Sequence, residues 1–226
     1  MSDSQLLKLA PQPEPPLATP WANPPYDLVA VAASLGGLRA LSQLLSVLPA
    51  DFAAAIVVVQ HLSPHHRSWL ADILQRCTVL PVKQAEEADR LRRGAVYIAP
   101  PNKHLLVNAD GRLCLCDSPP INFCRPAADK LFESVATSLK ERAIAVVLTG
   151  KDGDGALGVR AIKQRGGTVI VQDEATCVCF SMPSAAIATG SVDFVLPLDQ
   201  IGSTLTSLVG VAKAAPALST AAAGAL

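Results

Sequence analysis

The chain has 226 residues, enough for one α/β domain with a full core or for two small domains. Half of the residues are hydrophobic, which excludes a wholly disordered chain, and 19 basic residues balance 19 acidic ones, which argues against nucleic acid or an acidic membrane surface as a partner. No apolar run reaches the roughly 18 residues that a membrane span needs, so we expect no membrane insertion.

The two ends of the chain differ in composition from its centre. Seven of the eighteen prolines fall within the first 25 residues, so residues 1–26 are predicted to form a flexible arm. The alanine-rich residues 212–226 are predicted to be a disordered tail, which leaves one domain over residues 27–211. Because the N-terminus lacks the pattern of a secretory signal, the six cysteines are expected to be reduced thiols of a cytoplasmic protein.

Short apolar runs alternate with helical patterns along the centre of the chain. The runs are apolar throughout, which is typical of parallel strands covered on both faces. They lie at residues 28–33, 55–60, 95–99, 144–149, 168–172 and 192–196. Helical spacing follows several of them, in Leu38, Leu41, Leu45 and Leu48, then in Leu131, Val135 and Leu139, and finally in Ile201, Leu205 and Leu208.

Two further patterns complete the predicted architecture. Asp199 is expected to cap the last helix. Residues 104–108 and 113–116 are joined across Asp110-Gly111, which predicts a β-hairpin. The sequence therefore predicts a single doubly wound α/β domain with a mostly parallel sheet and an inserted β-hairpin.

Three residues with reactive side chains fall at the ends of predicted strands. Ser34 follows the first strand, His61 follows the second, and Asp154 lies in the loop after residues 144–149. Ligands of open parallel sheets bind at the carboxyl ends of the strands, and acyl transfer requires a nucleophile, a base and an orienting carboxylate. We predict that these three residues form a catalytic triad, while each of them taken alone also suits a structural role in a cap or a turn.

The sequence around Ser34 favours a nucleophile. Residues 32–37, Ala-Ala-Ser-Leu-Gly-Gly, resemble a nucleophile elbow, with Ala32 in place of the usual first glycine. The helix that begins near Gly36 would direct free backbone N–H groups at the site, as an oxyanion hole requires.

A different function is suggested by the loop that carries Asp154. Residues 153–158 are a literal G-x-G-x-x-G between a strand and a helix, and Asp173 follows some twenty positions later, as in a dinucleotide-binding domain. The motif lies late in the chain, however, and three residues separate Thr149 from Gly153 where the fingerprint begins almost at the strand end.

Several sequence blocks occur together in one order. They span residues 31–37, 59–62, 97–104, 125–129, 148–156 and 172–183. Jointly, over about residues 27–210, they resemble the catalytic domain of the CheB-type chemotaxis receptor methylesterases. The resemblance implies a serine hydrolase that demethylates glutamate methyl esters on the signalling helices of methylated chemoreceptors and often deamidates glutamines, with no metal or cofactor.

The resemblance assigns the family's site roles to the matching positions of this chain. Ser34 matches the family's nucleophile, His61 its base and Asp154 its triad aspartate. Leu35, Gly36 and Lys151 are expected to lie next to the substrate or its oxyanion. The family usually has methionine and glycine where this chain has Lys151 and Asp152, and the methionine lends a backbone N–H to the oxyanion hole, which Lys151 could replace.

Two further differences from the family leave alternatives open for regulation and function. Leu35 replaces a small or hydroxyl residue and is expected to narrow the entrance to the site. Full-length family members carry an N-terminal receiver domain, whereas only the proline-rich arm precedes this domain, so we expect constitutive activity or a separate regulatory partner. A non-catalytic or retargeted CheB-like signalling module is the alternative function.

Overall fold

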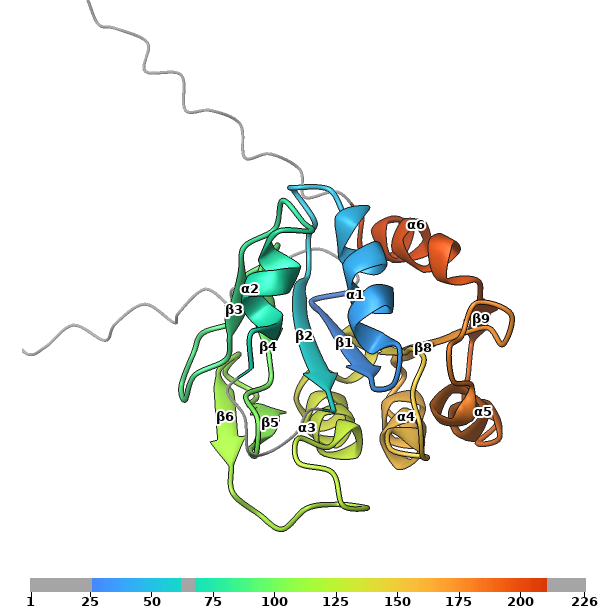
Figure 1. Cartoon of the computed structure of the whole chain (residues 1–226). Helices are drawn as coiled ribbons and strands as arrows, with labels where there is room; N and C mark the ends of the chain where they lie inside the picture. The colour runs from blue at the N-terminus through green and yellow to red at the C-terminus, as the bar shows by residue number, and fades with distance from the viewer. Residues whose placement is uncertain (1–25, 62–67, 211–226) are drawn as a thin grey trace, which may run out of the picture.

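The computed structural model describes residues 26–61 and 68–210 (Figure 1). The arm predicted over residues 1–26 and the tail predicted over 212–226 lie outside these ranges, apart from Tyr26, whose hydroxyl is 2.7 Å from Thr168 Oγ1. No helix within the described ranges is long and apolar enough to cross a membrane.

Seven parallel strands form the central sheet, in the order β3-β4-β2-β1-β7-β8-β9. The strands are β1 (Leu28–Ala33), β2 (Ala55–Gln60), β3 (Val82–Gln84), β4 (Val96–Ile98), β7 (Ala143–Val147), β8 (Thr168–Gln172) and β9 (Phe194–Leu196). All six predicted strands are present. The edge strand β3 was not predicted, because its three residues are not buried and contain no apolar run.

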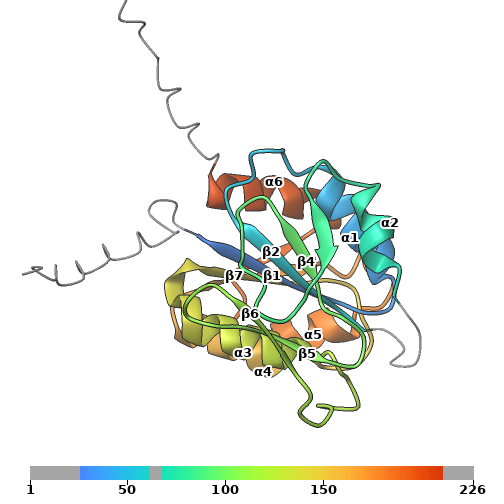
Figure 2. The ribbon, with the colours of Figure 1, turned by 90° about the vertical axis from the view of Figure 1, so that its left-hand side faces the viewer.

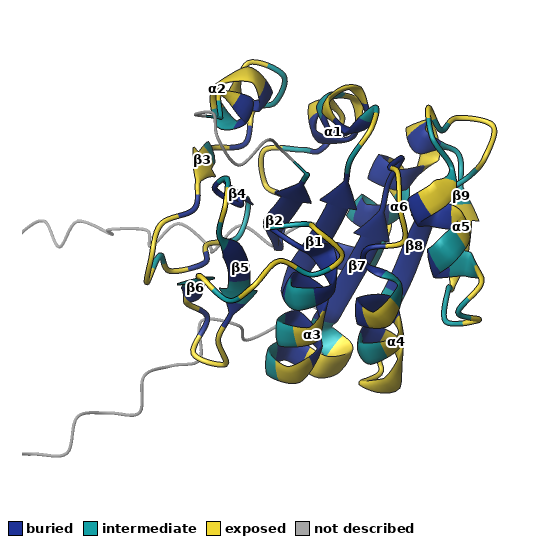
Figure 3. Cartoon of the chain, turned by 60° about the horizontal axis from the view of Figure 1, so that its bottom comes forward, coloured by how far each residue is buried: buried dark blue, intermediate teal, exposed yellow. Residues whose placement is uncertain are grey.

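The helices of the described residues cover both faces of the sheet (Figure 2). One face carries α1 (Gly37–Ser46), α2 (Leu70–Gln75) and α6 (Leu198–Val209), and the other carries α3 (Ala128–Leu139), α4 (Ala156–Gln164) and α5 (Ser181–Ile187). A short 3-10 turn, η1 (Lys140–Arg142), follows α3. The helices turn buried faces toward the sheet and exposed faces outward (Figure 3), which confirms the predicted doubly wound α/β architecture.

The strands are apolar throughout because each one contributes to two cores. Alternate residues of β1 enter different clusters, with Leu28, Ala30 and Ala32 facing α3 and α4. Val29, Val31 and Ala33 face α1 and α6 on the opposite side. Every residue of β1 is therefore buried.

The predicted hairpin is also present. Strands β5 (His104–Val107) and β6 (Leu113–Cys116) pair antiparallel in a separate two-stranded sheet. Leu105, Val107 and Leu113 of this hairpin join the core on the α3 side.

Details of two predicted helices differ in the structure. Helix α1 ends at Ser46, so Leu48 lies beyond it, and Leu38 is 43% exposed. Asp199 does not cap α6, because the helix begins one residue earlier, at Leu198, and Pro197 occupies the N-cap position. Asp199 lies in the first turn without a side-chain cap hydrogen bond.

The strand order determines where a site can form. From β1 the sheet grows toward β2, β4 and β3 on one side and toward β7, β8 and β9 on the other. The carboxyl ends of β2, β1 and β7 are therefore adjacent at the point where the strand order reverses, which is where open α/β sheets bind ligands.

Candidate active site

The sheet ladders extend past the strands into the residues of the predicted triad. The Ser34 N–H donates to the Thr149 carbonyl at 3.0 Å, and the His61 N–H donates to the Ala33 carbonyl at 3.1 Å. These bonds fix the backbone of the predicted nucleophile and base relative to each other. Ser34 and His61 line one hollow on the surface, and the predicted substrate-proximal residues Leu35, Gly36 and Lys151 line it too.

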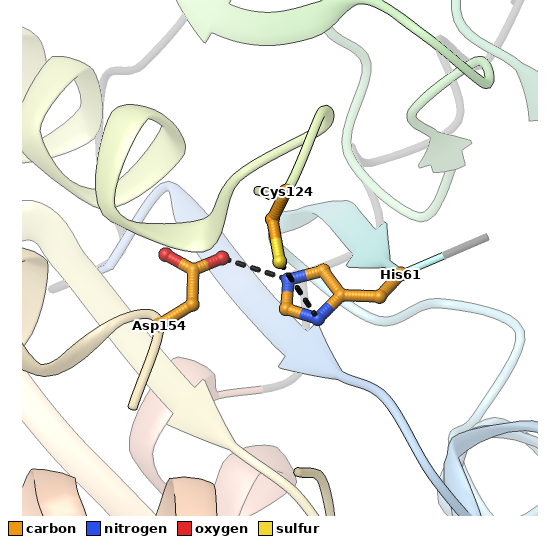
Figure 4. A group of neighbouring side chains, drawn as sticks. All are labelled: His61, Cys124 and Asp154. Atoms are coloured by element: carbon orange, nitrogen blue, oxygen red, sulfur yellow. Dashed lines mark hydrogen bonds and ion pairs between the residues drawn. The ribbon is translucent and has the colours of Figure 1, made fainter. Parts of the chain in front are cut away.

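Asp154 is hydrogen-bonded to His61 (Figure 4). Its Oδ2 is 2.7 Å from Nε2 of the ring, and the aspartate is 1% exposed. The carboxylate also accepts the N–H of Ala128 at 2.6 Å and that of Asp129 at 3.0 Å, at the start of α3. A helix N-terminus stabilises a negative charge, so these bonds hold Asp154 in position to orient the imidazole.

The surroundings of His61 favour its protonated form. Burial by itself would lower the pKa of the ring. The hydrogen bond to Asp154, the contact with Cys124 and the charges of both groups outweigh burial and raise the pKa from 6.5 to about 9. At neutral pH the ring of the free protein therefore carries a proton in most molecules.

The turn after β1 carries Ser34, which lines the hollow, and requires two glycines. Gly36 has φ 82, a left-handed conformation that side chains disfavour. A Cβ at Gly37 would lie 2.1 Å from Gln60 Oε1, because the Gln60 side chain crosses beneath this residue to donate to the Ser34 carbonyl at 2.8 Å. Among the described residues the Ser34 hydroxyl makes no hydrogen bond, and the His61 ring is bonded to Asp154 and Cys124 and not to Ser34.

Three residues that line the hollow together with Ser34 carry backbone N–H groups that are candidates for binding an oxyanion. Those of Leu35, Gly36 and Lys151 have no acceptor among the described residues. Thr149 ties the two loops together, since its Oγ1 donates to the Leu35 carbonyl at 2.9 Å and accepts the Cys179 N–H at 2.9 Å. The hollow can therefore offer preorganised donors to a developing negative charge.

Asp152 has an uncommon backbone conformation in the same loop. Its φ is 75, in the left-handed region, where the resemblance to the methylesterases expects glycine. The Ser181 hydroxyl donates to its carbonyl at 3.0 Å. Lys151 and Asp152 both line the hollow that Ser34 and His61 line.

Sequence reasoning did not single out Cys124, which faces the second nitrogen of the base. Its Sγ is 3.7 Å from Nδ1 of His61 and within 4.8 Å of the Asp154 carboxylate (Figure 4). The residue stands directly before the Arg125-Pro126 pair of a recognised sequence block, but 63 positions separate it from His61. The one sequence signal for Cys124 is its position next to that block.

The side chains of His61 and its two neighbours, Cys124 and Asp154, can also be considered as metal ligands. One ligand atom each from His61, Cys124 and Asp154 lie within 4.8 Å of one another. The Asp154 oxygens, however, already accept two backbone N–H groups and face the His61 ring. The arrangement fits a hydrogen-bonded relay to the imidazole better than a shared ion.

The glycines of the dinucleotide-like motif have structural roles. A Cβ at Gly158 would lie 2.5 Å from Phe132 Cβ, so this glycine permits α4 to pack closely on α3. Gly155, with φ 98, is the N-cap of α4. The carboxylate of Asp154 is bonded to α3, and nothing in this loop geometry favours a dinucleotide.

Comparisons with known proteins agree on one family. The sequence profile of the family described as CheB methylesterase matches residues 29–205. The chain is 44% identical over 199 residues to the protein-glutamate methylesterase FrzG of Myxococcus xanthus, covering 87% of this chain and 60% of that protein. It is 40% identical over 186 residues to a protein-glutamate methylesterase/protein-glutamine glutaminase of Symbiobacterium thermophilum, covering 82% of this chain and 51% of that protein.

A solved structure is similar over most of the chain. The CheB methylesterase catalytic domain of Thermotoga maritima superposes with a TM-score of 0.79 at 41% identity, covering 81% of this chain and 99% of that one. The present chain thus spans between half and two thirds of the length of the first curated relatives, and nearly all of a catalytic domain.

Proposed function

Because the chain belongs to the CheB methylesterase family, we propose that it is a protein-glutamate methylesterase that hydrolyses glutamate methyl esters on methylated chemotaxis receptors. The relatives' names also support deamidation of glutamines as a second activity. The observation that carries the proposal is the 2.7 Å hydrogen bond between Asp154 and His61, beside a hollow that contains Ser34. The six free thiols support a cytoplasmic location.

In the proposed reaction Ser34 is the nucleophile. Because Nε2 of His61 is bonded to Asp154, Nδ1 is the nitrogen that accepts the Ser34 proton as the hydroxyl attacks the ester carbonyl. The N–H groups of Leu35, Gly36 and Lys151 surround the developing oxyanion. His61 then returns the proton to the leaving methanol, and an ester links the glutamyl group to Ser34.

Water completes the cycle. His61 takes a proton from the water as its oxygen attacks the acyl-enzyme, and the Ser34 oxygen leaves with that proton, which releases a glutamate carboxylic acid that ionises in solution. With a glutamine substrate, ammonia replaces methanol as the first product. Asp154 keeps the imidazole in the required tautomer throughout.

The experiment that tests the proposal is methanol release from a methyl-esterified chemoreceptor. We expect the rate to fall by about a thousandfold or more in Ser34→Ala and in His61→Gln. Ser46→Ala is the matched control, because Ser46 is exposed at the far end of α1, and its rate should stay within twofold of the parent. Equal rates in Ser34→Ala and the parent would overturn the proposal, and no release by the folded parent would favour a non-catalytic or retargeted module.

A further inference from the structure

A tight turn holds Cys124 against the base. Ile121 and Cys124 exchange two backbone hydrogen bonds, of 3.1 and 2.8 Å, across a two-residue turn. The two central residues, Asn122 and Phe123, have φ 46 and 66, the left-handed values of a type I′ turn. The turn fixes the cysteine backbone, so the approach of its thiol to His61 is a built feature of the fold.

Cys124 is accessible from two sides. Its side chain is half-buried. It lines the hollow that contains Ser34, and it also lines a second hollow of about 260 Å³ with Asn102, Phe123 and Arg125. A small reagent can therefore reach the sulfur.

The contact of Cys124 with an imidazole distinguishes it from the other thiols. Among the hydrogen bonds of the described residues, only that of Cys124 joins a cysteine to a histidine. Asp154 binds Nε2 of the same ring, and its carboxylate lies within 4.8 Å of the sulfur, so the three side chains form one cluster around the imidazole. An imidazole that can take the thiol proton leaves a thiolate, which is the form that attacks soft electrophiles.

We propose that Cys124 is a modification site, a thiol activated by His61 that peroxides and alkylating agents modify, and that its modification disables the esterase site. The reactivity stands on the geometry of the thiol and the imidazole alone. The loss of activity rests on the proposed function.

The reaction with hydrogen peroxide balances without a cofactor. In molecules whose His61 ring is neutral, the Cys124 proton passes to Nδ1 of His61, and the thiolate attacks one peroxide oxygen, so that an S–O bond forms while the O–O bond breaks. The hydroxide that leaves takes the proton from His61 and becomes water. The sulfur loses two electrons, peroxide is reduced, and the product is a sulfenic acid, which a small thiol can convert to a mixed disulfide with release of water and a second thiol can reduce.

The modified sulfur occupies the space beside Nδ1. That nitrogen is the one that must accept the Ser34 proton, because Nε2 is bonded to Asp154. An oxygen or a larger adduct on the sulfur, 3.7 Å from Nδ1 in the unmodified protein, fills this space or hydrogen-bonds to the nitrogen. Either effect prevents Nδ1 from accepting the Ser34 proton.

The test measures labelling and activity in the full chain. The protein is treated with a limiting amount of iodoacetamide, or with peroxide followed by a sulfenic-acid probe. Peptide mass spectrometry then identifies which cysteines are labelled. Cys116 is the stringent internal control, because hydrogen bonds from Ser118 lower its pKa, while the ring nitrogens of its cross-strand neighbour His104 bind backbone groups instead of its sulfur. We expect Cys124 to be labelled at least about tenfold faster than Cys116, and His61→Gln to remove most of that difference.

Inactivation is followed in the same samples. Labelling of Ser34 by a fluorophosphonate reports the state of the serine and the base without any receptor. It should be lost at the rate at which Cys124 is modified in the parent and in Cys116→Ala, and should survive treatment in Cys124→Ala. Should His61→Gln not fold, Asp154→Asn, which loosens the hold on the same ring, should also slow the labelling of Cys124.

Either of two results would overturn the proposal. Cys124 could react no faster than Cys116, or the Ser34 probe could still react fully after Cys124 is completely modified. A failure of methanol release alone would count against the methylesterase proposal and leave the labelling result to decide this one.

Discussion

Asp129 and Asp154 each bind the N-terminus of the helix that belongs to the other. Asp154, which precedes α4, accepts the first two N–H groups of α3 at 2.6 and 3.0 Å. Asp129, in the first turn of α3, accepts the Gly158 N–H of α4 at 2.8 Å. The exchange fixes the two helices relative to each other and holds the carboxylate that orients His61.

Replacing Asp129 should therefore weaken both the fold and the site. Asp129→Ala leaves the buried Gly158 N–H without its acceptor, so we expect a loss of about 1–3 kcal/mol in the free energy of unfolding in urea. Asp199→Ala is the matched control, since Asp199 also lies in a first helical turn but makes no side-chain cap bond, and it should change stability by less than about 0.5 kcal/mol. Equal losses in the two variants would contradict the capping role.

The raised pKa of His61 predicts an alkaline pH profile. The base must be neutral to accept the Ser34 proton, and its pKa is about 9, so kcat/KM should rise about tenfold per pH unit up to about pH 9 and then level off. Cys124 is one of the groups that raise this pKa, so in Cys124→Ala the rising limb should move to lower pH. Rates measured from pH 6 to 10 test both statements, and an unmoved limb would show that Cys124 does not act on the base.

Gly150 has no room for a side chain. A Cβ at this position would lie 2.1 Å from Met182 Sδ and 2.9 Å from Ser34 Cβ. Gly150→Ala should displace Ser34 and lower kcat by about tenfold to a hundredfold. In Gly153→Ala the nearest atom is 3.5 Å away, an ordinary contact, so that variant should retain most of its kcat. Similar rates in the two variants would disprove the crowding of Ser34.

Asp152 should be replaceable by glycine with a gain in stability. Its φ of 75 disfavours a side chain, so Asp152→Gly should raise the free energy of unfolding by about 0.5–1 kcal/mol. Asp152→Asn keeps a residue that tolerates this conformation and removes the charge, so its stability should equal that of the parent. A gain in the asparagine variant as large as in the glycine variant would assign the effect to charge instead of conformation. Urea unfolding of the parent and the two variants measures these differences in stability.

The sequence predicted the elements whose patterns are local. Runs buried on both faces and the Asp110-Gly111 turn gave the long strands and the hairpin. The edge strand β3 and the short helices α2 and α5 were not predicted, since three to seven residues carry too little periodicity.

The part of the candidate site that lies at the ends of strands could be predicted from the sequence. Ser34, His61 and Asp154 follow adjacent strands, so a topological rule brings them together. Cys124 reaches His61 only through the left-handed turn before it, and Asp129 reaches α4 only through the packing of two helices. Neither relationship leaves a periodic trace in the sequence.

The extension of the sheet ladders into the site links the reaction centre to the most protected part of the molecule. The Ser34 and His61 amides complete hydrogen bonds along β1, whose residues are all buried, so these amides should exchange with solvent deuterium only when the whole sheet opens. The amides of the Ile121–Cys124 turn bond only to each other at the surface and should exchange through local opening. The amides of the serine and its base should thus exchange as slowly as the core of the sheet, whereas those of the turn that carries Cys124 should exchange faster.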